Sequence, residues 1–302
     1  MNVLVAGGKG FLGTRLVRLL ARKGDRVTVL TRGSVPPVLR DGVRFARWDG
    51  VNSAQVLDEV AHADAVVNLS GASVGEGRWT KKRKREIEES RIVTTETLVR
   101  AMSKTSSPPR VFLCMSAVGF YGEGGEEELT ETHAQGGGFL AELSRRWEGV
   151  AVRVRDRGIR VVLPRTALVL SSEGGALGRM ILPYRLFLGG PLGSGEQWFP
   201  WVHADDAVAS MAFALASEDL IGPFNVSAPG AVRMEEFARE LGKALRRPSF
   251  LRVPSWVLML ALGEMAETIL RSQRVIPQVL LRHGYQFRFP HLDQALRDIW
   301  HP

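Results

Sequence analysis

Short apolar runs alternate with amphipathic stretches of helical length along the first 170 residues of the chain. The runs are rich in valine and leucine, as buried strands are, and we place strands at 3–6, 27–30, 43–48, 65–69, 111–115 and 160–163. Helical patterns lie between them, and two of these are at 14–23 and 91–102. This alternation predicts an α/β fold with a doubly wound parallel sheet that carries helices on both faces.

The first apolar run leads directly into a glycine-rich turn. Gly7, Gly10 and Gly13 follow the strand at intervals of three residues and precede a helical pattern. The first glycine allows a tight turn, the second lets backbone N–H groups approach a phosphate, and the third lets the helix pack closely on the strand. The helix N-terminus adds unpaired donors and a positive dipole end. The pattern predicts a Rossmann-type fold that binds a dinucleotide, and the alternative is a purely structural turn.

The end of the second strand indicates which dinucleotide is bound. NAD-preferring proteins of this fold carry an acidic side chain there, which binds the ribose hydroxyls, whereas this chain has Thr31 and Arg32. A carboxylate would repel a 2′-phosphate, while a guanidinium binds one through two hydrogen bonds. Lys9 in the glycine turn adds a second positive charge. We therefore expect NADP(H) as the cofactor, and the alternative is that Arg32 is an ordinary solvated loop residue.

The regular alternation ends near residue 170. Gly- and Pro-rich turns follow, and helical patterns return at 204–216, 234–245 and 255–270. We predict an NADP-binding domain over residues 1–170, with elements that return to its sheet as far as about residue 228. A smaller mixed substrate lobe is expected over 171–302. The glycine and acidic residues of 122–138 predict a surface loop.

The charge pattern argues against a nucleic-acid partner. The chain has a net charge of +8, and its densest basic run, at 81–85, is followed by acidic residues at helical spacing. Such a run is usually a solvated helix face, and no aromatic residues are interleaved for base stacking. We therefore expect a small-molecule substrate and no nucleic acid.

Cysteine content and hydropathy suggest where the protein acts. The single cysteine, Cys114, excludes an intramolecular disulfide and lies in an apolar run, where it is expected to be a buried structural thiol. We find no signal segment before the first strand and no apolar stretch of membrane-spanning length. These features predict a cytoplasmic protein without a membrane partner, either a monomer or a dimer. No His/Cys/Asp cluster has metal-ligand spacing, so no metal is expected.

Several longer motifs together resemble one family. They lie at 68–72, 78–80, 90–91, 116–122, 139–142, 182–206, 263–265 and 273–277, and so cover nearly the whole chain. The pattern is similar to the atypical, extended short-chain dehydrogenase/reductases, in the branch of NAD(P)-dependent epimerase-like proteins with a C-terminal domain of unknown function. The resemblance implies that this family-specific domain lies at about 249–296.

The resemblance also implies a set of cofactor-binding residues. The pyrophosphate would lie on Gly7, Gly10, Phe11, Leu12 and Gly13, with Thr31 and Arg32 at the adenosine end; Leu69, Ser70 and Gly71 would line the carboxyl edge of the sheet, where ligands of such folds gather. Arg91 stands near the place where extended relatives carry an asparagine that reaches the cofactor. Its contact would therefore be cationic and could meet a phosphate.

Active members of this superfamily use a Tyr-x-x-x-Lys pair, in which the tyrosine transfers a proton and the lysine lowers its pKa. Phe139 and Leu143 occupy those positions here, so the standard pair is absent. The resemblance places Ser116 where relatives keep a catalytic serine that binds the reacting oxygen. Tyr121 is the candidate proton donor. The alternatives are that Ser116 is a turn residue and that Tyr121 only packs near the nicotinamide.

Several other polar and aromatic residues are further candidates for the site. Glu142 is either a carboxylate base or a helix-surface residue, and His203 with Asp205 and Asp206 is either an acid/base set or a helix N-terminus. The segment 189–201 would supply aromatic walls to a pocket or pack as core. Arg165 and Arg185 would anchor an anionic substrate or pair with a carboxylate of the small lobe.

Two functions remain open at this point. The first is an NADP(H)-binding protein of the epimerase or oxidoreductase type that acts on an unidentified small molecule without the usual Tyr-x-x-x-Lys pair. The second is a non-catalytic NADP(H)-dependent binding or regulatory protein, with a link to cell division as a variant.

Overall fold

The computed structural model describes residues 1–33, 35 and 42–300, and its centre is a parallel eight-stranded sheet. The strands follow the order β12-β8-β5-β4-β1-β2-β3, and a short β6 also pairs with β8. Their bounds are β1 (Asn2–Ala6), β2 (Arg26–Thr31), β3 (Val43–Arg47), β4 (Ala65–Asn68), β5 (Val111–Cys114), β6 (Ser116–Ala117), β8 (Arg160–Thr166) and β12 (Gly222–Val226). The order reverses direction between β1 and β4, where ligands of doubly wound sheets bind. The predicted fold class is confirmed.

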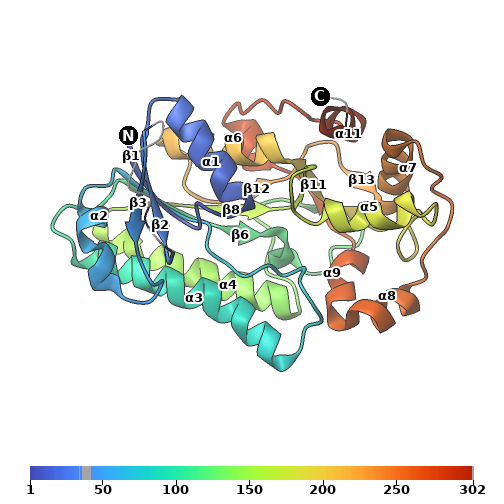
Figure 1. Ribbon diagram of the computed structural model, residues 1–302, viewed down its shortest axis with the longest axis horizontal. Coiled ribbons are helices and arrows are strands. Elements are labelled where there is room, and N and C mark those ends of the chain that lie inside the picture. The colour runs from blue at the N-terminus through green and yellow to red at the C-terminus, as the bar shows by residue number, and fades with distance from the viewer. Residues whose placement is uncertain (34, 36–41, 301–302) are drawn as a thin grey trace.

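Helices cover both faces of this sheet (Figure 1). On one face lie α1 (Phe11–Arg22) and α6 (Ala204–Ala216), which bury Leu16 and Met211 against the strands. On the other lie α2 (Leu57–Ala61), α3 (Lys81–Lys104) and α4 (Phe139–Ala151), with Trp147 in the core. Cys114 is buried in this second layer, and burial raises the pKa of its thiol to about 12. The thiol is therefore protonated and unreactive near neutral pH.

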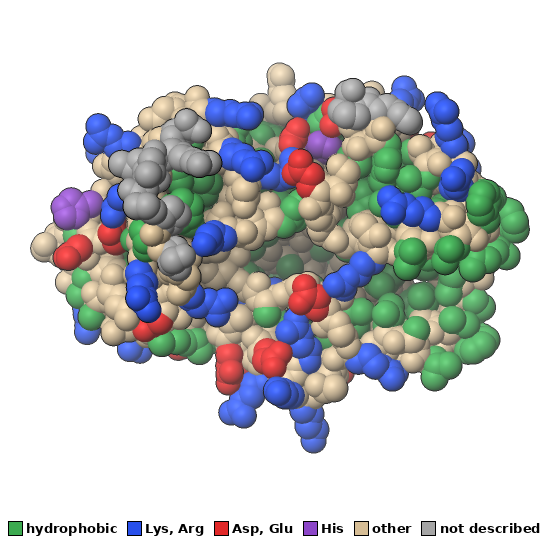
Figure 2. Space-filling model, viewed as in Figure 1, with side chains coloured by type: hydrophobic (Ala, Val, Ile, Leu, Met, Phe, Trp, Pro, Cys, Tyr) green, Lys and Arg blue, Asp and Glu red, His purple; other side chains and the backbone are tan. Residues whose placement is uncertain are grey.

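A smaller lobe of mixed structure packs at one end of the sheet. It contains β9 (Leu168–Leu170), α5 (Leu177–Arg185), β10 (Trp198–Phe199), β11 (Trp201–His203), β13 (Val232–Arg233), α7 (Met234–Leu245) and α11 (Leu292–Trp300). Tyr184, Trp201 and Phe237 lie in its core. Between α7 and α11 run α8 (Ser255–Leu262), α9 (Glu267–Leu270), β14 (Arg274–Val275) and α10 (Gln278–Arg282). Hydrophobic side chains lie on the surface of this end of the molecule (Figure 2).

Several element boundaries differ from the sequence-based expectations. Helix α1 begins at Phe11 instead of residue 14, because Gly10 is extended and forms its N-cap. The helix expected at 255–270 is broken at Gly263, where φ is 61°, a conformation that favours glycine. Within 122–138, β7 (Glu128–Leu129) pairs with β14, and Glu131 is buried, so this segment is not simply a surface loop. None of the described helices is both long and apolar enough to cross a bilayer.

Candidate cofactor and active site

The glycine turn is packed too closely for any side chain at two of its positions. Gly7 has φ 79°, and a Cβ on it would lie 2.6 Å from the carbonyl carbon of Leu69. A Cβ on Gly13 would lie 2.1 Å from the carbonyl oxygen of Gly7. Within the described part of the chain no side chain caps the N-terminus of α1, and its positive dipole end can face an anion. This cradle fits the pyrophosphate of a dinucleotide.

The end of β2 gathers the residues expected at the adenosine end. Lys9 Nζ lies 3.3 Å from Thr31 Oγ1, and the N–H of Gly33 donates to the same hydroxyl at 3.2 Å. Arg32 lies between Thr31 and Gly33 in the chain, and its side chain is exposed. Lys9 Nζ also lies over the ring of Phe45. Two cations therefore stand at this strand end, where a 2′-phosphate would need them.

The loop after β4 lies directly against the glycine turn. Asn68 Oδ1 accepts a hydrogen bond from the N–H of Ser70 at 3.1 Å, which shapes the chain as it leaves the strand. A Cβ on Gly71 would lie 3.0 Å from Arg91 Cζ, so the guanidinium of Arg91 packs against this loop. Arg91 Nη1 donates to the carbonyls of Ala72 and Ile87, each at 3.0 Å. The predicted residues at this edge are thus brought together.

Burial changes the acidity of Arg91 without neutralising it. Desolvation, with a smaller contribution from Arg83, lowers its pKa to about 10. The guanidinium therefore remains charged at neutral pH. It places a fixed positive charge beside the carboxyl end of β4.

Ser116 and Tyr121 belong to one buried polar network. Ser116 Oγ donates to Glu148 Oε1 at 2.6 Å, and Arg165 binds both oxygens of Glu148, at 2.9 and 2.8 Å. Arg165 also donates to the Tyr121 hydroxyl at 3.2 Å, and that hydroxyl donates to Asn225 Oδ1 at 2.6 Å. All five side chains are buried.

The register of the sheet explains why these residues meet. Ser116 on β6 and Asn225 on β12 both stand opposite Arg165 on β8. Side chains of paired residues project from the same face, which here is the face covered by α4, the helix that supplies Glu148. Sequence reasoning missed Glu148 and Asn225. The available signal was Arg165, an arginine inside the largely apolar segment 161–170.

The two candidate catalytic hydroxyls differ in the hydrogen bonds that they can still make to a substrate. Burial raises the pKa of Tyr121 to about 12, although the positive charge of Arg165 acts in the opposite direction. Its hydroxyl already accepts one hydrogen bond and donates one within the protein. The oxygen of Ser116 donates its proton to Glu148 and keeps its capacity to accept a hydrogen bond.

The positions of the absent Tyr-x-x-x-Lys pair are packed with apolar groups. Phe139 stacks edge-on against Trp79, with ring centroids 5.2 Å apart, and lies beneath Lys84. Leu143 is buried. Glu142 is exposed and hydrogen-bonded to Arg145, as expected of a helix-surface residue. None of these three supplies a buried proton donor.

The remaining candidates take structural positions. Arg165 pairs with Glu148 of α4 and not with a carboxylate of the small lobe, while Arg185 is exposed at the end of α5. Within the segment 189–201, Trp201 lies in the lobe core, and Gln197 donates to the carbonyl of Leu192. Asp206 accepts the N–H groups of Arg288 and Phe289, each at 2.8 Å. It thereby ties the segment before α11 to α6.

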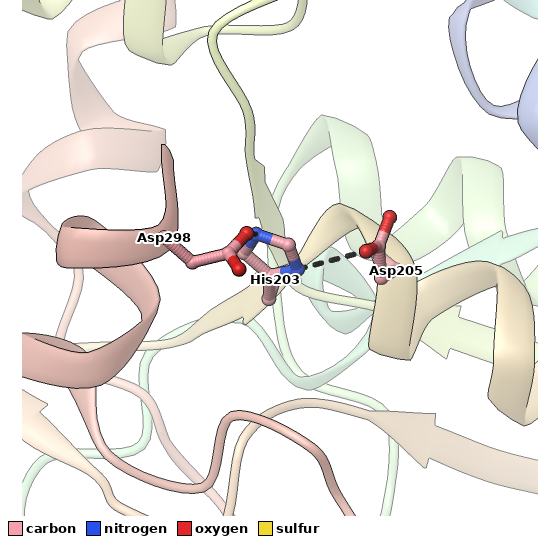
Figure 3. A group of neighbouring side chains, drawn as sticks. All are labelled: His203, Asp205 and Asp298. Atoms are coloured by element: carbon pink, nitrogen blue, oxygen red, sulfur yellow. Dashed lines mark hydrogen bonds and ion pairs between the residues drawn. The ribbon is translucent and has the colours of Figure 1, made fainter. Parts of the chain in front are cut away.

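His203 and two aspartates form a separate group at the start of α6 (Figure 3). His203 Nδ1 accepts the N–H of Asp205 at 3.2 Å, and its Nε2 lies 3.5 Å from Asp298. Asp205 faces Arg15 at 3.0 Å, and Arg288 lies within 3.6 Å of both carboxylates. Arg15 is shared with Glu173 at 2.8 Å, and the group forms a helix cap supported by these ion pairs.

Burial lowers the pKa of His203, while the nearby aspartates act in the opposite direction. A histidine whose pKa is lower in the folded state than in the unfolded state costs stability as the pH falls through its ordinary value, near 6.5. His203→Asn keeps an N-cap acceptor but cannot titrate. We expect a smaller loss of unfolding free energy between pH 7.5 and 5.5 (about one unit either side of that value) than in the unchanged protein, measured by urea denaturation. Equal losses would contradict this assignment.

Comparison with known proteins found matches that together cover nearly the whole chain. The model of the NAD dependent epimerase/dehydratase family matches residues 3–227, and a domain of unknown function, DUF1731, matches residues 253–299. The epimerase family protein YfhF of Bacillus subtilis is 36% identical over 300 residues, which cover 99% of this chain and 98% of that protein.

A crystal structure of the human epimerase family protein SDR39U1 with NADPH superposes with a TM-score of 0.88, at 36% identity and 99% coverage of both chains. The UDP-glucose 4-epimerase of Thermus thermophilus, solved with NAD, shares the fold at 20% identity and a TM-score of 0.76, over 98% of this chain and 97% of that one. By its sequence match over residues 3–227 and by its full-length relatives, the chain belongs to the NAD dependent epimerase/dehydratase family.

Proposed function

We propose that the protein binds NADP(H) at the crevice between β1 and β4 and acts on a small molecule as an epimerase- or oxidoreductase-like protein. The observation that carries this proposal is the glycine cradle with Lys9, Thr31 and Arg32 at its adenosine end, where an acidic side chain would mark NAD. The NADPH in the human relative's crystal structure supports the choice of cofactor.

The residues present suggest how the chain would hold the cofactor and substrate. The open N-terminus of α1 and the charge of Arg91 would stabilise the phosphates. The nicotinamide, when bound, accepts or supplies a hydride. Ser116 would accept a hydrogen bond from a substrate hydroxyl, since its own proton is directed to Glu148. Tyr121 would have to break its bonds to Arg165 and Asn225 before donating a proton, so we assign it to holding Arg165 in place.

One observation favours the alternative of a non-catalytic NADP(H)-dependent binding or regulatory protein. Phe139 and Leu143 fill the places of the usual proton-transfer pair with apolar side chains, and the Tyr121 hydroxyl is already engaged. A protein of this kind would respond to the cofactor without consuming it.

Turnover decides between the two functions. Incubation of the purified protein with NADPH and fractionated metabolite extracts is expected to oxidise the cofactor or to move deuterium from labelled NADPH into a metabolite. Ser116→Ala should abolish that transfer while NADPH binding persists. Binding without transfer in any fraction would favour the regulatory function.

Cofactor choice gives a second expected result. Lys9→Ala should reduce the affinity for NADPH by roughly tenfold or more, because a hydrogen bond to a charged group contributes about 1.5–3 kcal/mol. NADH, which lacks the 2′-phosphate, should bind almost unchanged. Isothermal titration calorimetry of both cofactors measures the difference, with Lys23→Ala, at the far end of α1, as the control. Equal losses for NADPH and NADH would contradict the assignment of Lys9 to the 2′-phosphate.

A further inference from the structure

Helix α8 is apolar on the side that faces solvent. Trp256 is 69% exposed, Leu260 is 71% exposed and Met259 is 40% exposed, while Leu258 is the one buried residue of the helix. A helix on the surface of a globular protein ordinarily turns charged or polar residues outward. Helix α8 therefore exposes side chains that another apolar phase would cover.

The exposed apolar surface continues beyond α8. Leu251 donates its N–H to the carbonyl of Gly189, which joins the segment before α8 to the segment after α5. Leu186, Phe187 and Phe250 are also largely exposed there. Figure 2 shows hydrophobic side chains gathered at this end, over α8 and near α5. We call the set Leu186, Phe187, Phe250, Trp256, Met259 and Leu260 the apolar end. Contiguous surfaces of this type mark interaction sites.

Arginines without a carboxylate partner lie next to the apolar end. Among the described residues, none of the following has an acidic side chain within ion-pair distance: Arg78, Arg185, Arg246 and Arg247. Arg78 donates to the carbonyl of Leu260, and the guanidinium of Arg247 lies over the ring of Phe187. These two contacts place positive charge next to the apolar side chains.

The acidic residues of this region do not offset that charge. Glu235, Glu264 and Glu267 are each already paired with a cation, namely Arg252, Lys84 and Arg271. The surface therefore combines exposed aromatic and aliphatic groups with an excess of positive charge. Exposed aromatic and aliphatic side chains can enter the interface of a bilayer, and neighbouring cations are attracted to anionic lipids.

We propose that the apolar end docks on the surface of an anionic lipid bilayer, with α8 lying in the interfacial plane. Trp256 and Leu260 would enter the boundary between headgroups and acyl chains, and the surrounding cations would face lipid phosphates. At eight residues, α8 is far too short to span. The absence of a spanning helix, on which the expectation of no membrane partner rested, therefore does not bear on this mode.

A second copy of the chain fits the apolar end less well than an anionic bilayer does. A two-fold symmetric dimer places the same patch of each protomer in one interface. The unpaired arginines of both copies would then meet, and like charges brought together destabilise such an interface. A bilayer that carries negative charge removes this repulsion. The proposal is independent of the cofactor and of any turnover.

Sedimentation with lipid vesicles tests the proposal on the full chain. The protein should sediment with vesicles of phosphatidylcholine and phosphatidylglycerol, much less with phosphatidylcholine alone, and less again as salt is added. The double substitution Trp256→Ser with Leu260→Ser should weaken binding to the anionic vesicles by roughly tenfold or more. Arg185→Glu with Arg247→Glu should weaken binding to the anionic vesicles alone.

Ile221→Ser is the matched control, because Ile221 is 61% exposed but lies outside the apolar end. Each variant should bind NADPH as the unchanged protein does, which shows that it has folded. The proposal is overturned if the unchanged protein ignores anionic vesicles or if the Trp256/Leu260 variant binds them equally well. It is also overturned if light scattering finds a lipid-free dimer that this variant dissociates, since the apolar end is then a homodimer interface.

Discussion

Replacing Gly13 by alanine should reduce NADPH affinity by roughly a hundredfold or more and should destabilise the fold. The added Cβ would lie 2.1 Å from the carbonyl oxygen of Gly7 and 2.7 Å from Gly8 Cα, and both neighbours are backbone atoms. Relief requires α1 to move away from the turn, which displaces the donors that face the phosphates. Hydrogen bonds to a charged group contribute about 1.5–3 kcal/mol each, so the loss of two accounts for the expected effect.

The stability cost should be about 1–3 kcal/mol, as for an overpacked core position. Calorimetric titration with NADPH and urea denaturation measure the two quantities separately. Gly149→Ala is the control, because Gly149 lies within α4 and a Cβ there meets no atom within 4 Å. That change should leave affinity unaltered and should stabilise the helix slightly. If Gly13→Ala bound NADPH normally, the turn would not be the phosphate cradle.

The parts of the fold that follow from local pattern were predictable from the sequence. Buried parallel strands are almost continuously apolar, so those around Val5, Val67 and Leu113 are visible in the sequence. The ends of helices were harder to predict, because each depends on the backbone conformation of a single residue. Gly10 begins α1 in an extended conformation, and Gly263 ends α8 at positive φ. Neither angle can be read from the letter G.

The candidate site also has one part that is local in the sequence and one part that depends on pairing between distant segments. The cradle at Gly7 and Gly13 is local in sequence, and its residues come together as the motif indicates. The network around Arg165 depends on register between β6, β8 and β12, and on a helix that brings Glu148 from elsewhere in the chain. Pairing between distant segments leaves no periodic signal. Arg165 could be singled out as unusual, but its partner could not be named.

Removing Arg165 should lower the free energy of unfolding more than the change at Gly13 does. In Arg165→Met the carboxylate of Glu148 would stay buried and would keep only the hydrogen bond from Ser116. Breaking one side of a buried ion pair costs roughly 3–5 kcal/mol, since an uncompensated charge remains out of water. Urea denaturation of the purified variant measures the change in unfolding free energy.

The double variant Arg165→Met with Glu148→Gln separates the charge from the packing. It removes both charges and leaves an amide that still accepts the hydrogen bond of Ser116, so most of the lost stability should return. If the double variant were as unstable as the single one, the cost would come instead from lost packing on Phe120, whose ring lies 3.5 Å from the guanidinium carbon. Recovery of stability with NADPH binding intact would show that the loss in the single variant comes from the uncompensated charge of Glu148, and that the ion pair is not needed to bind the cofactor.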